Sequence, residues 1–380
     1  MRSVVSCLCQ LLGVVANVHA MKKTLLVLLF FFAFRAFGQT PPAYIDTLFH
    51  GTNGLENKLP HVGISIGILQ DGKASYYAFG NLSHTSAQKV DSNTVFEVGS
   101  NTKLFTALLL AVQIAVGKIP ETAYLDDYLP YKVELAPGLK NKIRLTDLAS
   151  SSSGLPTLSG DEYDDLLFAK DSVQPYKSVD KDYIYRVLRE TTVIPDQGKY
   201  EYSNFNYGLL GLVLENITGR KYAYLVRKDV LNHLGLRDTY TDSVPGENVA
   251  AGYYEGKPVD YLELDALKPA GVMRSNATDM LRFLGYQLHP PGGPMGTAIE
   301  LTQKEFVSDS TLTTALGWHI LKDEARDPYH IMQGDTPGNS SLLFFDKKHN
   351  TGIVVLVNES NHNLTGIVLD YLLESMFREE

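Results

Sequence analysis

The sequence predicts an α+β protein in which an antiparallel sheet, flanked by helices, is joined to a mostly helical region. Three observations predict this class. Near the start of the 380-residue chain, apolar residues alternate with smaller ones; near its end, five apolar residues follow one another without a break; between them lie apolar segments that end at glycine. We therefore expect the two ends of the chain to build one sheet, and the middle to fold as helices.

The strands are expected in two pairs. Residues 62–68 alternate in the manner of a strand, an Asp-Gly turn follows, and residues 74–79 resume the extended pattern, which predicts a β-hairpin. A second pair is expected at 340–345 and 353–357, joined by a polar turn. The apolar run 353–357 is typical of a central strand that is buried on both faces. Residues 364–377 have helical spacing and are expected to pack on this sheet.

The middle of the chain predicts three apolar helices, each followed by a glycine suited to the left-handed conformation past a helix end: 104–116, 207–217 and 222–234, with Gly117, Gly219 and Gly235. From this division we expect residues 39–105 and 265–380 to form an α/β domain and residues 106–264 a helical domain. The active site is expected between them.

The first 38 residues have the pattern of a leader. Two lysines after Met21 precede the apolar stretch Leu25 to Phe34, and small residues occupy positions −3 and −1 before Gln39. This order is that of a secretory signal peptide, so we expect Met21 to be the true start and residues 21–38 to be the signal peptide. Ten apolar residues are too few to span a bilayer. We therefore expect export to a periplasm or secretion, with no permanent membrane anchor.

Composition excludes several classes of function. The 34 basic and 43 acidic residues leave a formal net charge of −9, whereas nucleic-acid binding needs a dominant basic face. Both cysteines, Cys7 and Cys9, lie in the leader, so the mature chain would have no disulfide, cysteine nucleophile or thiolate metal site. The histidines show no pair with the spacing of metal ligands, which argues against a metallohydrolase.

Acyl transfer without metal or cysteine needs a hydroxyl nucleophile, a base and donors for the oxyanion. Ser-x-x-Lys provides the first two, because three residues along a helix place the amine above the hydroxyl. The pattern begins at Ser86, Ser100 and Ser178. Ser86 lies in a polar stretch, and Ser178 would cap a helix. Ser100 instead opens an apolar helix, where burial favours a neutral Lys103 and the helix dipole favours an anionic oxygen. Simple capping is the alternative for Ser100.

Two further segments carry groups suited to catalysis. Tyr202-Ser203-Asn204 is the only Tyr-x-Asn in the chain and directly precedes a predicted helix. A phenol held near a lysine amine can share its proton, and an asparagine amide can donate to a substrate carbonyl. The segment Met332 to Gly338 is rich in small residues, which would let a substrate lie along the edge of the strand that follows. Hydrogen-bonded turns are the alternative interpretation of both segments.

In their order and context, these segments resemble the serine β-lactamase and penicillin-binding-protein superfamily, in its class C β-lactamase-like branch of esterases, D-amino-acid peptidases and lactamases. The resemblance covers about Gly63 to Glu359 and implies a β-lactamase/transpeptidase-like fold. The segments that carry it are residues 96–103, 148–156, 202–211, 269–271 with Ser275 and Asp279, 316–318 and 336–338.

The resemblance implies that Ser100 is the nucleophile, that Lys103 and Tyr202 share the role of general base, and that Asn204 is an amide donor. The backbone N–H groups of Ser100 and Asp335 would form the oxyanion hole. A small-molecule or peptide substrate would acylate Ser100, and water activated near Tyr202 would release the product, so that no metal or organic cofactor is required. The implied substrate-binding residues are Asn204, Met332, Gly334, Asp335 and Thr336.

One position departs from the family pattern. Two residues before Gly334 the family usually has lysine or histidine, and this chain has Met332, whose thioether carries no charge. His330 would share its strand face, and Asp335 stands where the family prefers a small residue. We therefore expect an exported serine hydrolase that cleaves an ester or amide with a neutral or cationic acyl partner. The alternatives are a true class C-type β-lactamase and a catalytically silent binder of cell-wall fragments or of a protein.

Overall fold

The computed structural model describes residues 41–377, apart from 53, 60–61, 159–160, 172–173, 309–311 and 324–325. The predicted leader and both cysteines lie outside the described residues, and export stays a prediction. The chain divides into two compact units, Met1–Ala43 and Tyr44–Glu380, and the sheet and its packed helices belong to the second. Among the described residues, no helix combines the length and the apolarity that a membrane span requires.

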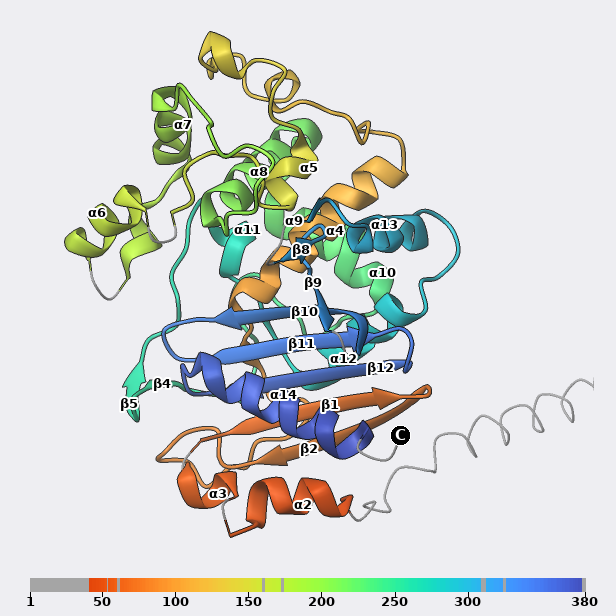
Figure 1. Ribbon diagram of the computed structural model, residues 1–380. Helices are drawn as coiled ribbons and strands as arrows, with labels where there is room; N and C mark the ends of the chain where they lie inside the picture. The colour runs from red at the N-terminus through yellow and green to blue at the C-terminus, as the bar shows by residue number, and fades with distance from the viewer. Residues whose placement is uncertain are drawn as a thin grey trace, which may run out of the picture. The chain divides into compact units, whose positions relative to one another are not determined.

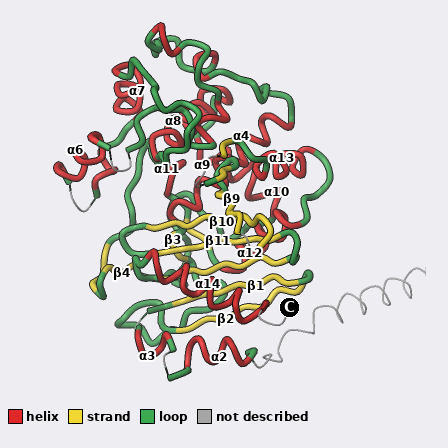
Figure 2. The backbone as a smooth tube through the Cα atoms, in the orientation of Figure 1, coloured by secondary structure: helices red, strands yellow, loops and turns green. Residues whose placement is uncertain are grey.

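An eight-stranded antiparallel sheet forms the centre of the second unit, in the order β2-β1-β12-β11-β10-β9-β8-β7 (Figures 1 and 2). Its strands are β1 (Ile64–Gln70), β2 (Lys73–Phe79), β7 (Val307–Ser308), β8 (Thr313–Thr314), β9 (His319–Asp323), β10 (Arg326–Asp335), β11 (Ser340–Asp346) and β12 (Thr351–Val357). Two short sheets pair β3 (Phe96–Glu97) with β6 (Arg274–Ser275), and β4 (Gly252–Tyr254) with β5 (Lys257–Val259).

The two ends of the chain meet in this sheet because β1 pairs with β12. The apolar run 353–357 lies in β12, between β1 and β11, and each of its side chains is fully buried. Burying a side chain of this size stabilises the fold by roughly 1.5–3 kcal/mol. The predicted α+β class, with an antiparallel sheet flanked by helices, is confirmed.

Helices cover both faces of the sheet. On one face, α2 (Ala43–His50) and α14 (His362–Phe377) contribute Phe49 and Val368 to an apolar cluster with β1, β11 and β12. On the other face, α12 (Ala277–Leu288) contributes Phe283 to a larger cluster that continues into the helical middle of the chain. Figure 1 shows α14 lying across the strands.

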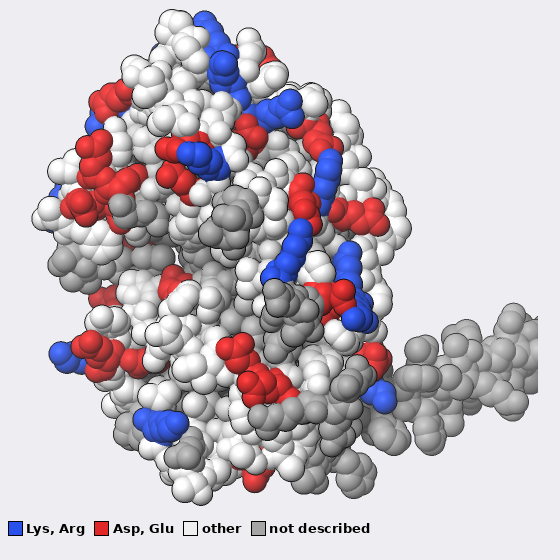
Figure 3. Space-filling view, viewed as in Figure 1, with Lys and Arg blue, Asp and Glu red and all other residues white. Residues whose placement is uncertain are grey.

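The remaining helices are α3 (Leu55–Lys58), α4 (Thr102–Ala115), α5 (Leu145–Ala149), α6 (Glu162–Lys170), α7 (Lys181–Glu190), α8 (Asn204–Thr218), α9 (Tyr222–Val226), α10 (Asn232–Leu234), α11 (Lys268–Gly271) and α13 (Pro294–Gln303). Short 3-10 turns occur at Gly99–Asn101, Leu125–Asp127, Pro137–Leu139 and Pro175–Ser178. On the face seen in Figure 3, acidic side chains gather over α6.

The three predicted middle helices correspond to α4, α8 and α9 with α10, the last pair being joined by a π-helical turn at Arg227–Leu231. Gly219 and Gly235 end them with φ of 65° and 64°, in the left-handed conformation that glycine adopts without strain. The capping role expected for Ser178 is wrong. Asp180 caps α7 by accepting from the backbone N–H of Tyr183. The division into two domains stays a prediction.

Candidate active site

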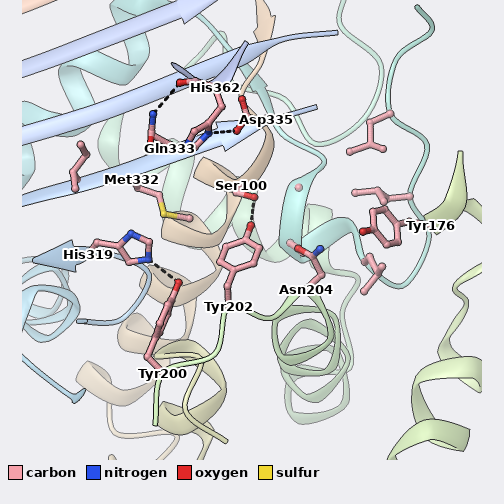
Figure 4. A pocket seen from close by; sticks show the side chains of 16 residues that line it. Ser100, Tyr176, Tyr200, Tyr202, Asn204, His319, Met332, Gln333, Asp335 and His362 are labelled. Carbon is pink, nitrogen blue, oxygen red and sulfur yellow. Dashed lines mark hydrogen bonds and ion pairs between the residues drawn. The ribbon is translucent and has the colours of Figure 1, made fainter. Parts of the chain in front are cut away.

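A cavity of about 560 Å³ lies where several segments of the chain meet, and four of them supply most of its lining (Figure 4). These are the turn that carries Ser100, the end of β10, the stretch 200–204, and the segment 262–271. Apolar side chains of the last segment line it together with tyrosines, and Asp335 and His362 supply carboxylate and imidazole groups. Among the described residues that line the cavity, none is a lysine or an arginine.

Backbone contact places Ser100 directly beside β10. Ser100 lies in the 3-10 turn Gly99–Asn101 that leads from β3 into α4. A Cβ added to Gly334 would lie 2.9 Å from Ser100 N and 2.2 Å from Val98 O, and one added to Gly99 would lie 2.9 Å from Asp335 N. Only glycine permits this approach. The backbones of Ser100 and Asp335 are therefore neighbours, as the predicted oxyanion hole requires.

The amine of Lys103 connects the predicted site residues. Its Nζ lies 3.2 Å from Ser100 Oγ, 2.7 Å from the Tyr202 hydroxyl, 2.9 Å from Asn204 Oδ1 and 2.9 Å from Ala270 O. The hydroxyl groups of Ser100 and Tyr202 are also hydrogen-bonded to each other. The structure thus brings together an alcohol from the turn before α4, an amine from α4 and a phenol from the segment just before α8.

Tyr202 and Asn204 are held in place by the local structure at the start of α8. Ser203 caps α8 by accepting from the backbone N–H of Asn206 at 3.0 Å, which is the usual role of serine before a helix. This cap places Tyr202 just before the helix and Asn204 in its first turn. The amide of Asn204 also donates to Leu158 O at 3.2 Å, so both ends of that side chain are fixed.

Burial decides the protonation of Lys103. Its side chain is 1% exposed, and burial lowers its pKa well below the ordinary value, because a charged amine loses its hydration there. A neutral amine has two N–H groups and one lone pair. The carbonyl oxygens of Asn204 and Ala270 can take the two N–H groups, which leaves the lone pair for a hydroxyl proton of Ser100 or Tyr202.

The phenol of Tyr202 is held in its protonated form. Burial raises its pKa to about 12; the hydrogen bond with Ser100 opposes this shift, and the charge of Asp335 adds to it. Tyr202 can pass a proton between Ser100 and Lys103, but little tyrosinate forms near neutral pH.

Met332 and His319 occupy one side of the cavity (Figure 4). Met332 is 3% exposed and brings no charge near Tyr202. His319, which the sequence did not single out, shares a 2.8 Å hydrogen bond with the Tyr200 hydroxyl. Burial lowers the pKa of His319 to about 4, so its imidazole is neutral at physiological pH. The side of the cavity next to Met332 therefore carries no positive charge.

His330 lies outside the cavity lining. Its ring stacks on Phe345 with centroids 4.4 Å apart and meets Trp318 edge-on. Burial lowers its pKa to about 4. These contacts give it a structural role in the sheet, and it does not replace the charge missing at Met332.

The other predicted residues of the 332–336 segment differ in whether they line the cavity. Asp335 lines the cavity, but Gly334 and Thr336 do not. Gly334 packs on the backbone of the Ser100 turn, and the Thr336 hydroxyl accepts from the backbone N–H of Asn339 at 3.0 Å, which holds the turn before β11. Substrate binding by these two residues stays a prediction.

Four of the tyrosines and histidines that line the cavity were not predicted as site residues: Tyr176, Tyr200, His319 and His362. One signal in the sequence could have found Tyr200. It lies two residues before Tyr202, and the two tyrosines of an extended segment point to the same side. Tyr176, His319 and His362 lie in segments far along the chain from Ser100. No local sequence pattern predicts that these segments line the cavity.

Comparison with known proteins identifies the family of the chain. The sequence profile of the family described as Beta-lactamase matches residues 53–374. The chain belongs to the beta-lactamase family. It is therefore an enzyme of the serine-hydrolase type. Among relatives in this family, a beta-lactamase of Pseudomonas fluorescens is 29% identical over 291 residues, which is 74% of each chain.

Other proteins are similar to this chain at lower sequence identity. Protein flp of Staphylococcus aureus is 25% identical over 80% of this chain, which spans 61% of its length. Two crystal structures share the fold: a beta-lactamase/D-alanine carboxypeptidase from Pseudomonas syringae (TM-score 0.75, 21% identity, 86% and 96% of the two chains) and a class C beta lactamase from Rhodobacter sphaeroides (TM-score 0.72, 24% identity, 85% and 97%).

Proposed function

We propose that this chain hydrolyses an ester or an amide through an acyl-enzyme on Ser100. The observation that carries the proposal is the contact of Ser100 Oγ with both Lys103 Nζ and the Tyr202 hydroxyl at the edge of an open cavity. A neutral amine beside a hydroxyl is the arrangement that activates a serine nucleophile.

Acylation follows from these contacts. Ser100 Oγ attacks the substrate carbonyl while its proton passes to Lys103, directly or through Tyr202. The backbone N–H groups of Ser100 and Asp335 stabilise the developing oxyanion, a contribution typically worth roughly 10²- to 10³-fold per donor. The proton then moves to the leaving group, the bond to that group breaks, and the acyl group remains on Ser100.

Labelling with a fluorophosphonate tests the nucleophile. We expect one covalent adduct whose mass maps to Ser100, and no adduct in Ser100→Ala, because the other Ser-x-x-Lys serines lie outside the cavity lining. Ser86→Ala is the matched control and should label like the native chain. If neither a fluorophosphonate nor a penicillin probe acylates the native chain, the protein is instead a silent binder.

The charge of the cavity favours a substrate without an anionic group near the scissile bond. The described lining holds the carboxylate of Asp335, no lysine or arginine, and a neutral His319. An anionic β-lactam would find no fixed cation there to pair with its carboxylate. A β-lactamase activity, which the name of the Pseudomonas fluorescens relative suggests, is the second candidate.

Restoring a cation at Met332 tests this preference. We expect Met332→Lys to raise the ratio of cephalosporin to neutral-ester hydrolysis by roughly tenfold, the equivalent of about 1.4 kcal/mol. The lysine would attract the substrate carboxylate and favour ionisation of Tyr202. Met332→Leu, which adds no charge, should leave the ratio unchanged. Cephalosporin hydrolysis by the native chain as fast as that of simple esters would contradict the preference.

A further inference from the structure

Asp335 and His362 form a hydrogen-bonded pair at the edge of the cavity. His362 Nδ1 lies 2.6 Å from Asp335 Oδ2, and the other carboxylate oxygen accepts from Ser340 Oγ at 2.5 Å. A carboxylate only accepts hydrogen bonds, so the shared proton resides on Nδ1. The Nε2 atom of a neutral His362 then has a free lone pair, as in a general base.

The pair is anchored next to the nucleophile. Asp335 directly follows Gly334, whose backbone contacts the Ser100 turn. The carbonyl oxygen of His362 accepts from Gln333 Nε2 at 3.3 Å, which ties the start of α14 to β10. Figure 4 shows the pair on one side of Ser100 and Tyr202 on the other. The His362 side chain is 60% exposed, so water reaches it.

The Asp335–His362 pair differs in its location from a second aspartate–histidine pair of the chain. His349 Nδ1 lies 2.6 Å from Asp346 Oδ2, with the same atoms in contact, in the turn between β11 and β12. That pair is outside the cavity lining, whereas Asp335 and His362 both line the cavity that Ser100 opens into. His349 therefore provides a matched control.

Hydrolysis of an acyl-enzyme needs a base for the incoming water, and Tyr202 is poorly suited to this step. Its phenol is protonated at neutral pH because burial raises its pKa to about 12, and the charge of Asp335 adds to that shift. Met332 supplies no cation that would favour a tyrosinate. The N–H groups of Lys103 are directed to the oxygens of Asn204 and Ala270.

We propose that the Asp335–His362 pair activates the water that hydrolyses the acyl-enzyme, an inference that rests on the proposed acylation of Ser100. Water attacks the acyl carbonyl carbon as His362 Nε2 takes one of its protons, and Asp335 stabilises the resulting imidazolium. The tetrahedral intermediate collapses, the bond from carbon to Ser100 Oγ breaks, and the imidazolium of His362 returns its proton to Oγ. The products are the free acid and the original serine. His362 is thus a catalytic residue, and Asp335 is a positioning residue.

The test separates acylation from deacylation with a p-nitrophenyl ester in rapid-mixing experiments. In His362→Gln we expect a nitrophenol burst of native rate and stoichiometric amplitude, followed by turnover slowed roughly 10²- to 10⁴-fold. The acyl-enzyme should accumulate and be visible by mass spectrometry. Asp335→Asn should slow turnover less, added imidazole should restore part of the turnover of His362→Ala, and His349→Gln should behave like the native chain.

Several outcomes would overturn the inference. Native turnover in His362→Gln would exclude a role for the imidazole. Equal losses of burst rate and turnover, without rescue by imidazole, would assign the pair a structural role. Absence of any acyl adduct on Ser100 in the native chain would instead refute the proposed function. The first two results leave the acyl-enzyme intact, so the failures are distinguishable.

Discussion

Replacing Lys103 with methionine is expected to slow acylation of Ser100 roughly 10²- to 10⁴-fold, the range that a positioned general base contributes. The amine is the group that contacts the nucleophile, the phenol and Asn204 together, and methionine fills a similar volume without a lone pair that can take the proton. Burst kinetics with a chromogenic ester measure the effect directly. Lys118→Met, at an exposed lysine just past the end of α4, is the control.

The same variant should change how stability depends on pH. The folded chain holds Lys103 neutral because burial lowers its pKa, whereas the unfolded chain protonates it up to its ordinary pKa near 10.4. Between the two pKa values the unfolded state binds more protons, so the free energy of unfolding rises with pH. Denaturation at pH 7 and pH 10 should show a smaller rise in Lys103→Met than in the native chain. If Lys103→Met showed the native acylation rate and the native rise in unfolding free energy with pH, Lys103 would not be a neutral base.

Gly334→Ala is expected to damage both the site and the fold. Its new methyl group would lie 2.2 Å from Val98 O and 2.9 Å from Ser100 N, and backbone atoms cannot swing aside as a flexible side chain can. Overpacking of this kind typically costs about 1–3 kcal/mol. Moving β10 also displaces the Asp335 N–H, and the loss of one oxyanion donor slows such reactions roughly 10²- to 10³-fold. Chemical denaturation and burst kinetics measure the two effects separately.

A second glycine provides the comparison for Gly334. A Cβ on Gly285, within α12, would meet Leu69 Cδ2 at 3.5 Å, an ordinary contact. Gly285→Ala should therefore stabilise the helix by about 0.5–1 kcal/mol and leave acylation unchanged. If Gly334→Ala behaved in the same way, the backbone contact between β10 and the Ser100 turn would not be essential.

Much of the fold could be predicted because its signals are local. The run 353–357 is apolar at every position, which suits only a strand with neighbours on both sides, and Gly219 and Gly235 mark helix ends through their own backbone preferences. The contact of Ser100 with Lys103 was expected from their spacing on a helix. The approach of Tyr202 was expected from the resemblance, because 102 residues separate it from Ser100.

The rest of the site depends on contacts that no short pattern contains. His319 lies 119 residues from its partner Tyr200, and nothing around either residue indicates the other. His362 has an ordinary place at the start of a helix and joins the cavity only because α14 packs beside β10. Ser178 satisfied a local rule for capping, but Asp180 lies closer to the first turn of α7 and takes that position.

The pairing of β1 with β12 means that the sheet can be completed only after both strands have been synthesised. These strands lie near opposite ends of the chain, and contacts of such high sequence separation form slowly. A ribosome that has made residues 1–300 has released Ser100 and Lys103, but it has not yet made β10, whose backbone supports the Ser100 turn. A nascent chain therefore carries an incomplete catalytic centre until β10 has been synthesised and has paired beside the Ser100 turn.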